Sequence, residues 1–379
     1  MTCLKEIINQ IGVCGGGKLG AQLYSTSCYL RYEIYRLIEA QPELKLSPPE
    51  VSTSSPLLEP NSTATGSTST TNPHVKRLSS HSVQGVQELK TEVMLVAKLL
   101  HRNLVSLLGF CLEEKEKLLV YEYLPNGSLD KILFVEGKRH LLEWERRYKI
   151  IVGIASGLLY LHEESQLRVI HRDLKASYIL LDENMNPKIS DFGLAKLFPG
   201  SQTHGNTYRV AGTLGYMAPE YFKNGNFSTK SDVYSYGLLV LEIITGRKNL
   251  SFRDSTNLQS HAWEHWSNGT ALEIMDPTMG DQWPKHEALK CIHIGLLCVQ
   301  EAAADRPKMS EVVLMLNSSN VSSSSAPSRP AFFISEEAFD SESIRREDSG
   351  LGITINGSLP GGSNQSVKGL TITELHPRG

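Results

Sequence analysis

The sequence lacks a run of apolar residues long enough to cross a membrane. The best candidate, residues 150–161, is shorter than the roughly 20 residues that a bilayer-spanning helix needs, and its spacing fits a buried helix better. The first ten residues, MTCLKEIINQ, also lack the basic stretch followed by an apolar stretch that marks a secretory signal peptide. The sequence as written therefore predicts a soluble chain.

Clustered positive charge is absent as well. The formal net charge is −3 at pH 7, and Lys and Arg do not form a basic run. Nucleic acids and anionic membranes are usually bound by clustered basic surfaces, so neither is predicted as a partner. Hydrophobic residues make up 40% of the chain and charged residues 21%, which is ordinary for a globular protein with a packed core.

Cysteine is scarce and unevenly placed. Three of the six cysteines lie in the first 28 residues, and the other three are scattered through the rest of the chain. Isolated cysteines in an intracellular domain are usually buried thiols. We expect this for Cys291 and Cys298, which lie in the apolar stretch ALKCIHIGLLCVQE.

The most informative stretch begins at His171 and reads HRDLKASYILLDENMNPKISDFG. Phosphoryl transfer requires an oriented carboxylate at the acceptor hydroxyl, a carboxylate on a metal ion and cations on the phosphates. Asp173, Asp191 and Lys175 fit these three roles. HRD and DFG in this order and at this spacing resemble the catalytic loop and the magnesium loop of eukaryotic protein kinases, whereas either triplet alone would be a weak signal.

This resemblance implies an α+β fold of two lobes, with a mostly helical large lobe, that transfers the γ-phosphate of ATP to a protein substrate with the help of Mg²⁺. Lys175, two residues after Asp173, is typical of the class that phosphorylates serine and threonine. Lys76 stands where the kinase strand lysine belongs. Apolar residues at helical spacing between residues 86 and 99 predict a helix that carries Glu92, and the resemblance implies that Glu92 pairs with Lys76.

The resemblance assigns further roles along the chain. Glu122 and Tyr123 fall at the hinge whose backbone binds adenine. The segment after Asp191 resembles an activation segment, in which Arg172 could clamp a phosphate on Thr203 or Thr207, because a guanidinium offers a fork to phosphate oxygens. Thr207 is the preferred acceptor, and unmodified loop hydroxyls are the alternative. Structural roles are implied for His171, Phe192, Glu220, Asp232 and Arg306, with Asp232 bracing the catalytic loop and Arg306 pairing with Glu220.

Both ends of the chain resemble one kinase group. The strings GK-x-G and SC-x-x-RYE in residues 1–46 are similar to the closing part of the extracellular module of plant cysteine-rich receptor-like kinases. Cys3 and Cys28 could pair as part of such a module, and a small helix and hairpin with free thiols is the alternative. Residues 47–74 are a Ser/Thr/Pro-rich linker, residues 75–316 the kinase domain, and residues 317–379 a tail whose composition predicts disorder.

Three departures from the family pattern concern the chemistry. No G-x-G-x-x-G-x-V motif precedes Lys76, His74 replaces the alanine two residues before that lysine, and Tyr178 replaces the asparagine that holds a second Mg²⁺. A phenol is a poor ligand for Mg²⁺, which prefers carboxylate, carbonyl and water oxygens.

The departures predict a small lobe reduced to about three of its usual five strands, and impaired activity. The alternative function is a pseudokinase-like protein that competes with intact receptor-like kinases, which would be its partners. The family resides in the plasma membrane with its kinase domain in the cytoplasm, whereas the chain as written is predicted to be soluble and cytoplasmic.

Overall fold

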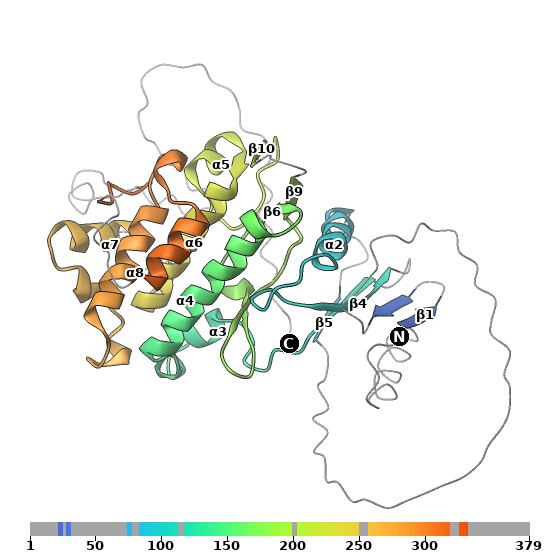
Figure 1. The fold of residues 1–379 in the computed structure, drawn as a ribbon, viewed down its shortest axis with the longest axis horizontal. Coiled ribbons are helices and arrows are strands. Elements are labelled where there is room, and N and C mark those ends of the chain that lie inside the picture. The colour runs from blue at the N-terminus through green and yellow to red at the C-terminus, as the bar shows by residue number, and fades with distance from the viewer. Residues whose placement is uncertain are drawn as a thin grey trace, which may run out of the picture. The chain divides into compact units, whose positions relative to one another are not determined.

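The computed structural model describes residues 22–25, 28–31, 74–77, 83–112, 117–198, 203–249, 257–318 and 326–332. The chain divides into two compact units (Figure 1). Unit 1 comprises Met1–His81 and Leu107–Tyr123, and unit 2 comprises Ser82–Ser106 and Leu124–Gly379.

Unit 1 contains a five-stranded antiparallel sheet in the order β1-β2-β4-β5-β3. The strands are β1 (Gln22–Ser25), β2 (Cys28–Arg31), β3 (His74–Arg77), β4 (Leu107–Leu112) and β5 (Lys117–Tyr121). Strand β5 reads KLLVY and is buried from Leu118 onward, because it lies between β4 and β3. The pairing of β3 with β5 sets Lys76 opposite Leu119.

The sheet contains more strands than the kinase resemblance predicts. Strands β3, β4 and β5 are the three expected from the kinase part of the sequence. Strands β1 and β2 come from the segment that resembles the cysteine-rich module, and β2 pairs with β4 so that Cys28 lies opposite Cys111. An edge strand exposes unpaired backbone N–H and C=O groups. The β1–β2 hairpin therefore satisfies the backbone of β4 along this side.

Unit 2 is mainly helical. Its longer helices are α2 (Val83–Val96), α4 (Trp144–Leu159), α6 (Thr229–Thr245), α7 (Leu258–Ser267), α8 (Lys285–Cys298) and α9 (Met309–Asn317). The shorter ones are α3 (Asp130–Leu133), α5 (Pro219–Asn224), η1 (Arg139–Leu141), η2 (Tyr160–Glu164), η3 (Ala176–Tyr178), η4 (Ala271–Ile274), η5 (Pro277–Met279) and η6 (Ala303–Asp305). Three two-stranded sheets pair β6 (Arg168–Ile170) with β9 (Lys196–Phe198), β7 (Ile179–Leu181) with β8 (Pro187–Ile189), and β10 (His204–Asn206) with β11 (Asn226–Ser228).

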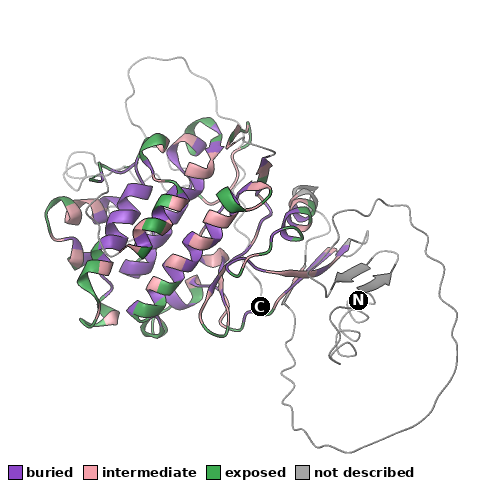
Figure 2. Cartoon of the chain, viewed as in Figure 1, coloured by how far each residue is buried: buried purple, intermediate pink, exposed green. Residues whose placement is uncertain are grey.

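Helix α6 forms the centre of unit 2 and packs against α4, α7 and α8 (Figure 2). It is apolar almost all round, and every residue from Ser231 to Thr245 is buried, as expected of a helix covered on all sides. Helices α6 and α8 approach closely at Gly237, where an added Cβ would lie 2.6 Å from the Cβ of Cys298. Burial raises the pKa of the Cys291 and Cys298 thiols to about 12, so both are inert, as the sequence predicts.

The segment at residues 326–332 differs from the disorder expected after residue 316. The Gln259 side chain donates a hydrogen bond to the carbonyl oxygen of Ala331 at 3.0 Å, and Gln300 forms a bridge with Pro330. Ala331 is buried. Unit 2 therefore extends beyond the boundary drawn from the sequence. The predicted linker lies outside the described residues except at His74, and so does the tail after Phe332.

In the described part of the chain, each helix is too short or too polar to cross a bilayer.

Candidate active site

Asp232 of helix α6 anchors the loop that follows β6. The Asp232 carboxylate accepts hydrogen bonds from the backbone N–H of His171 at 2.7 Å and of Arg172 at 2.8 Å, and lies 2.9 Å from Nε2 of His162. Burial alone would raise the pKa of Asp232. The hydrogen bond and charge of His162, the charge of His171 and the hydrogen bond from the Arg172 backbone outweigh burial and lower this pKa below its usual value. A charged Asp232 can thus stabilise the left-handed backbone of Arg172, whose φ is 69°.

His171 and Phe192 join this loop to the segment that carries Asp191. His171 lies with its Nε2 3.1 Å from the carbonyl oxygen of Ser190, and its ring meets the Phe192 ring edge-on at a centroid distance of 5.1 Å. Both side chains are fully buried. The loops that carry the HRD and DFG motifs, which were recognised in the sequence as separate motifs, therefore form one packed unit.

Asp173, the candidate base, lies at the centre of a small polar cluster. Its Oδ1 accepts hydrogen bonds from the backbone N–H of Thr213 at 2.8 Å and from the Thr213 hydroxyl at 2.7 Å. Lys175 Nζ donates to the same hydroxyl at 2.7 Å and lies 3.6 Å from Oδ2 of Asp173. The cluster combines an oriented carboxylate with a cation, which is what transfer of a phosphoryl group to a hydroxyl requires.

Thr213 is a site residue that was not predicted from the sequence. Its position in AGTLGYMAPEY, a few residues before the end of the predicted activation segment, was the available signal. The hydroxyl of Thr213 connects the two candidate catalytic side chains and ties the activation segment to them.

Asp191 follows β8 in a left-handed conformation with φ of 62°. A carboxylate is a suitable Mg²⁺ ligand, so Asp191 fits the metal role. Tyr178 does not fit: burial, together with the nearby Asp191 and Asp173 carboxylates, raises the pKa of its phenol. The phenol therefore stays protonated beside the carboxylates and cannot act as an anionic ligand.

Arg172, predicted to bind a phosphate group on the activation segment, contacts uncharged groups in the structure. Its guanidinium donates to the carbonyl oxygen of Leu194 at 3.0 Å and to the Tyr221 hydroxyl at 2.5 Å, and lies 4.6 Å from the centroid of the Phe227 ring. The Thr207 hydroxyl donates to the carbonyl oxygen of Arg209 at 3.0 Å. Thr203 directly precedes β10. Phosphorylation of either threonine stays a prediction.

The residues predicted to hold the nucleotide are divided between the units. Lys76 lies on β3, and Glu122 and Tyr123 directly follow β5, all in unit 1. Glu92 lies on α2 in unit 2 and is only 2% exposed, so the helix predicted from the apolar spacing is confirmed and Glu92 is on its buried side. The pairing of Lys76 with Glu92 stays a prediction.

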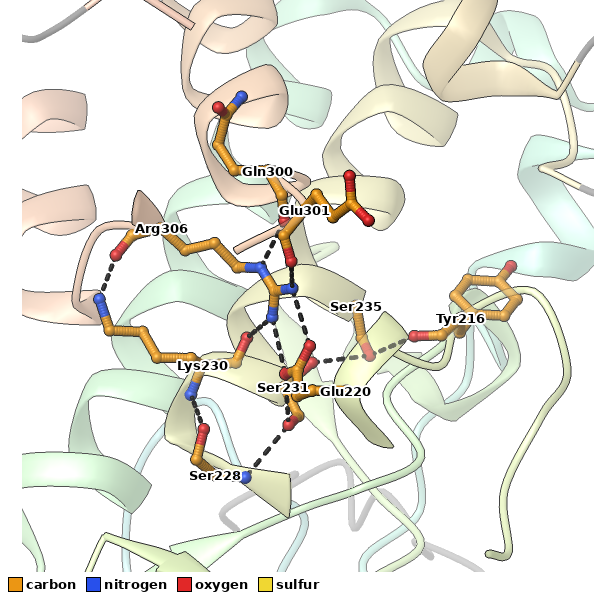
Figure 3. A network of polar contacts seen from close by, with 9 residues as sticks. All are labelled: Tyr216, Glu220, Ser228, Lys230, Ser231, Ser235, Gln300, Glu301 and Arg306. Carbon is orange, nitrogen blue, oxygen red and sulfur yellow. Dashed lines mark hydrogen bonds and ion pairs between the residues drawn. The ribbon is translucent and has the colours of Figure 1, made fainter. Parts of the chain in front are cut away.

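Arg306 and Glu220 form the ion pair that the resemblance implies. Arg306 donates to both oxygens of Glu220, at 2.8 and 2.9 Å, and to the backbone carbonyls of Lys230, Gln300 and Glu301 (Figure 3). The Arg306 side chain has no exposed surface. Because Glu220 lies in the first turn of α5, the network fixes the end of the activation segment on α6 and the residues after α8.

A second buried carboxylate, Glu242 of helix α6, holds the activation segment through Tyr216. The Tyr216 hydroxyl lies 2.7 and 2.8 Å from the two Glu242 oxygens, and the backbone N–H of Asn249 donates to Oε1 at 2.8 Å. Burial raises the pKa of Glu242 to about 7, from an ordinary value of 4.5. No sequence motif marks this pair, because an acidic residue inside an apolar helix can have many structural roles.

Glu242 makes the stability of the chain depend on pH. A carboxyl with a raised pKa in the folded state contributes stability that is present below pH 4.5 and is lost as the pH rises through about 7. We expect the free energy of unfolding to fall between pH 5 and 7.5, by about 2 kcal/mol more in the natural chain than in Glu242→Gln. Urea unfolding at several pH values measures this difference. Parallel pH profiles for the two proteins would contradict it.

Comparisons with known proteins identify the family of the chain. The sequence profile of the protein tyrosine and serine/threonine kinase family matches residues 59–316. The chain is 52% identical over 308 residues to cysteine-rich receptor-like protein kinase 34 of Arabidopsis thaliana, which covers 80% of this chain and 44% of that protein. It is 55% identical over 307 residues to cysteine-rich receptor-like protein kinase 6 of Oryza sativa subsp. japonica, with the same coverage.

A G-type lectin S-receptor-like serine/threonine-protein kinase of A. thaliana is 51% identical over 306 residues, covering 80% of this chain and 35% of that protein. The chain thus spans less than half the length of these relatives. The kinase fold and the resemblance predicted from the sequence are confirmed. The chain belongs to the protein tyrosine and serine/threonine kinase family, with plant cysteine-rich receptor-like protein kinases among its relatives.

Proposed function

We propose that this chain is a protein serine/threonine kinase that transfers the γ-phosphoryl group of ATP to a hydroxyl of a protein substrate. The observation that supports it most is the cluster of Asp173, Lys175 and Thr213, held on the loop that Asp232 anchors. Family membership adds the expectation of ATP, Mg²⁺ and a protein substrate.

Each side chain of the cluster has a defined task in this reaction. Asp173 orients the acceptor hydroxyl and accepts its proton through Oδ2, because Oδ1 is occupied by Thr213. Lys175 lies 3.6 Å from Oδ2 and offsets the negative charge that gathers on the transferred phosphoryl oxygens. Thr213 holds both groups at this separation.

The cofactor roles follow from the family pattern. Asp191 would hold Mg²⁺, which neutralises charge on the phosphate oxygens when bound. Lys76 and Glu92 would position the phosphates, and the backbone of Glu122 and Tyr123 would bind adenine. ATP is supplied in the cytoplasm, so we place the reaction there.

A second candidate function is a catalytically weak interaction protein that competes with intact receptor-like kinases. Tyr178 at the position of a metal ligand favours it, together with the lack of a glycine-rich loop motif before Lys76. Retention of Asp173, Asp191, Lys76 and Glu92 favours the enzyme.

The test uses the purified full chain with Mg²⁺ and ATP. A ligand that binds only the folded state stabilises it, by about 2.7 kcal/mol at a concentration of 100 times Kd. We therefore expect a rise in Tm with Mg-ATP, and transfer of labelled phosphate from ATP to serine or threonine of a general acceptor such as casein. A chain that melts cooperatively but shows neither effect would favour the interaction protein.

A further inference from the structure

Tyr178 is held beside the candidate metal ligand by its own backbone. It ends the short helix η3, and its carbonyl oxygen accepts hydrogen bonds from the backbone N–H and the hydroxyl of Ser190, each at 2.9 Å. The strands that follow and precede these residues, β7 and β8, are paired so that Ile179 lies opposite Ile189. Because Ser190 directly precedes Asp191, these hydrogen bonds and the strand pairing hold Tyr178 close to Asp191.

The Tyr178 side chain contacts both groups on which the proposed chemistry depends. Its phenol lies close enough to the Asp191 carboxylate for that group to raise its pKa. Its ring lies under the ammonium group of Lys175, with Nζ 4.2 Å from the ring centroid, which is within the range of a cation–π interaction. One residue therefore connects the metal-binding side of the site with the cation of the catalytic loop.

A phenol and an asparagine differ in what they offer a metal ion. The asparagine carbonyl oxygen is a neutral ligand that Mg²⁺ accepts readily, whereas the neutral phenol is a poor ligand. A protonated phenol is also a hydrogen-bond donor, so beside the Asp191 carboxylate it can occupy a lone pair that a metal ion would otherwise use. Tyr178 thus removes one ligand and competes for another.

We propose that Tyr178 closes the second metal position and restrains Asp191, so that the chain binds one divalent ion with its nucleotide instead of two. This inference rests on the proposed function, since the ion is the one that accompanies ATP. It identifies Tyr178 as a positioning residue that sets both the number of ions and their affinity.

The experiment counts bound Mn²⁺ by electron paramagnetic resonance, using the full chain with a non-hydrolysable ATP analogue. We expect one ion per chain in the natural protein and two in Tyr178→Asn. In Tyr178→Phe we expect one ion, bound about tenfold more tightly, because a hydrogen bond to a charged group no longer competes with the metal. Tyr148→Phe is the matched control. The Nζ of Lys290 lies 5.6 Å from the Tyr148 ring centroid, but the Tyr148 hydroxyl donates to the carbonyl oxygen of Leu316.

The outcomes separate this inference from the proposed function. Two ions in the natural chain, or one in a cooperatively folded Tyr178→Asn, would overturn the inference and leave the kinase proposal in place. Unchanged ion affinity in Tyr178→Phe would overturn the proposed competition even if the asparagine variant did not fold. Absence of bound ions in every variant, with no effect of the nucleotide on Tm, would overturn both.

Discussion

Replacing Asp173 by asparagine is expected to lower the rate of phosphoryl transfer by about 10²- to 10⁴-fold, the usual contribution of a positioned general base. Asparagine has nearly the same shape, and its carbonyl oxygen can still accept the two hydrogen bonds from Thr213 that Oδ1 accepts now. The amide nitrogen would replace Oδ2, which in the natural chain lies near Lys175. The variant therefore loses the proton acceptor while the loop keeps its anchor.

The rate is measured as transfer of labelled phosphate from ATP at saturating nucleotide, with the Tm shift by Mg-ATP recorded in parallel. We expect the Tm shift to be unchanged, because Asp173 acts on the acceptor hydroxyl. Asp182→Asn is the matched control: Asp182 caps the β7–β8 turn, accepting hydrogen bonds from the backbone of Asn184 and Asn186. Equal rates for Asp173→Asn and the natural chain would mean that another group accepts the proton.

The parts of the fold that the sequence predicts well are those set by local pattern. Apolar residues at helical spacing predicted the helix that became α2, and residues 150–161, predicted as a buried helix, lie in α4 and the start of η2. The HRD and DFG motifs were recognised by their order and spacing, and the β7–β8 hairpin lies between them. Periodicity and short-range spacing act within a few residues, so one sequence suffices to recognise them.

Contacts between distant segments could not be predicted in the same way. The pairing of strand β2 with β4, which sets Cys28 opposite Cys111, joins two parts of the chain that the sequence assigns to different modules. No local pattern selects the partner of an edge strand. The Ser-rich composition after α9 indicated disorder, yet Pro330 and Ala331 pack on unit 2. Composition averages over a window, whereas a few hydrogen bonds and one buried methyl group suffice to place a short segment.

The candidate site was predicted by residue type and position, but not by its contacts. Tyr178 was recognised as a departure because asparagine belongs there. Its position beside Asp191 and its ring contact with Lys175 depend on side-chain directions that the sequence does not contain. Likewise, Thr213 becomes part of the site only when the activation segment folds back on Asp173.

Replacing Arg306 by methionine is expected to lower the free energy of unfolding by about 3–5 kcal/mol, as for other buried ion pairs that lose one partner. The side chain has no exposed surface and makes five hydrogen bonds, two to the Glu220 carboxylate and three to backbone carbonyls. Methionine fills similar volume but leaves all five acceptors without this donor, and each buried unsatisfied group costs about 1–3 kcal/mol.

Urea unfolding of three variants separates the causes. Arg306→Lys keeps the positive charge but loses the planar guanidinium group, so we expect its free energy of unfolding to fall by less than that of Arg306→Met. Lys223→Met is the matched control, because Lys223 forms an exposed ion pair with Glu301 at 3.9 Å, and such pairs contribute about 0–1 kcal/mol. If Arg306→Met lost no more stability than Lys223→Met, the network would be an ordinary surface contact. Since Arg306 holds Glu220 at the end of the activation segment, a large loss should also release this segment, and proteolysis between residues 203 and 218 should then become faster in Arg306→Met alone.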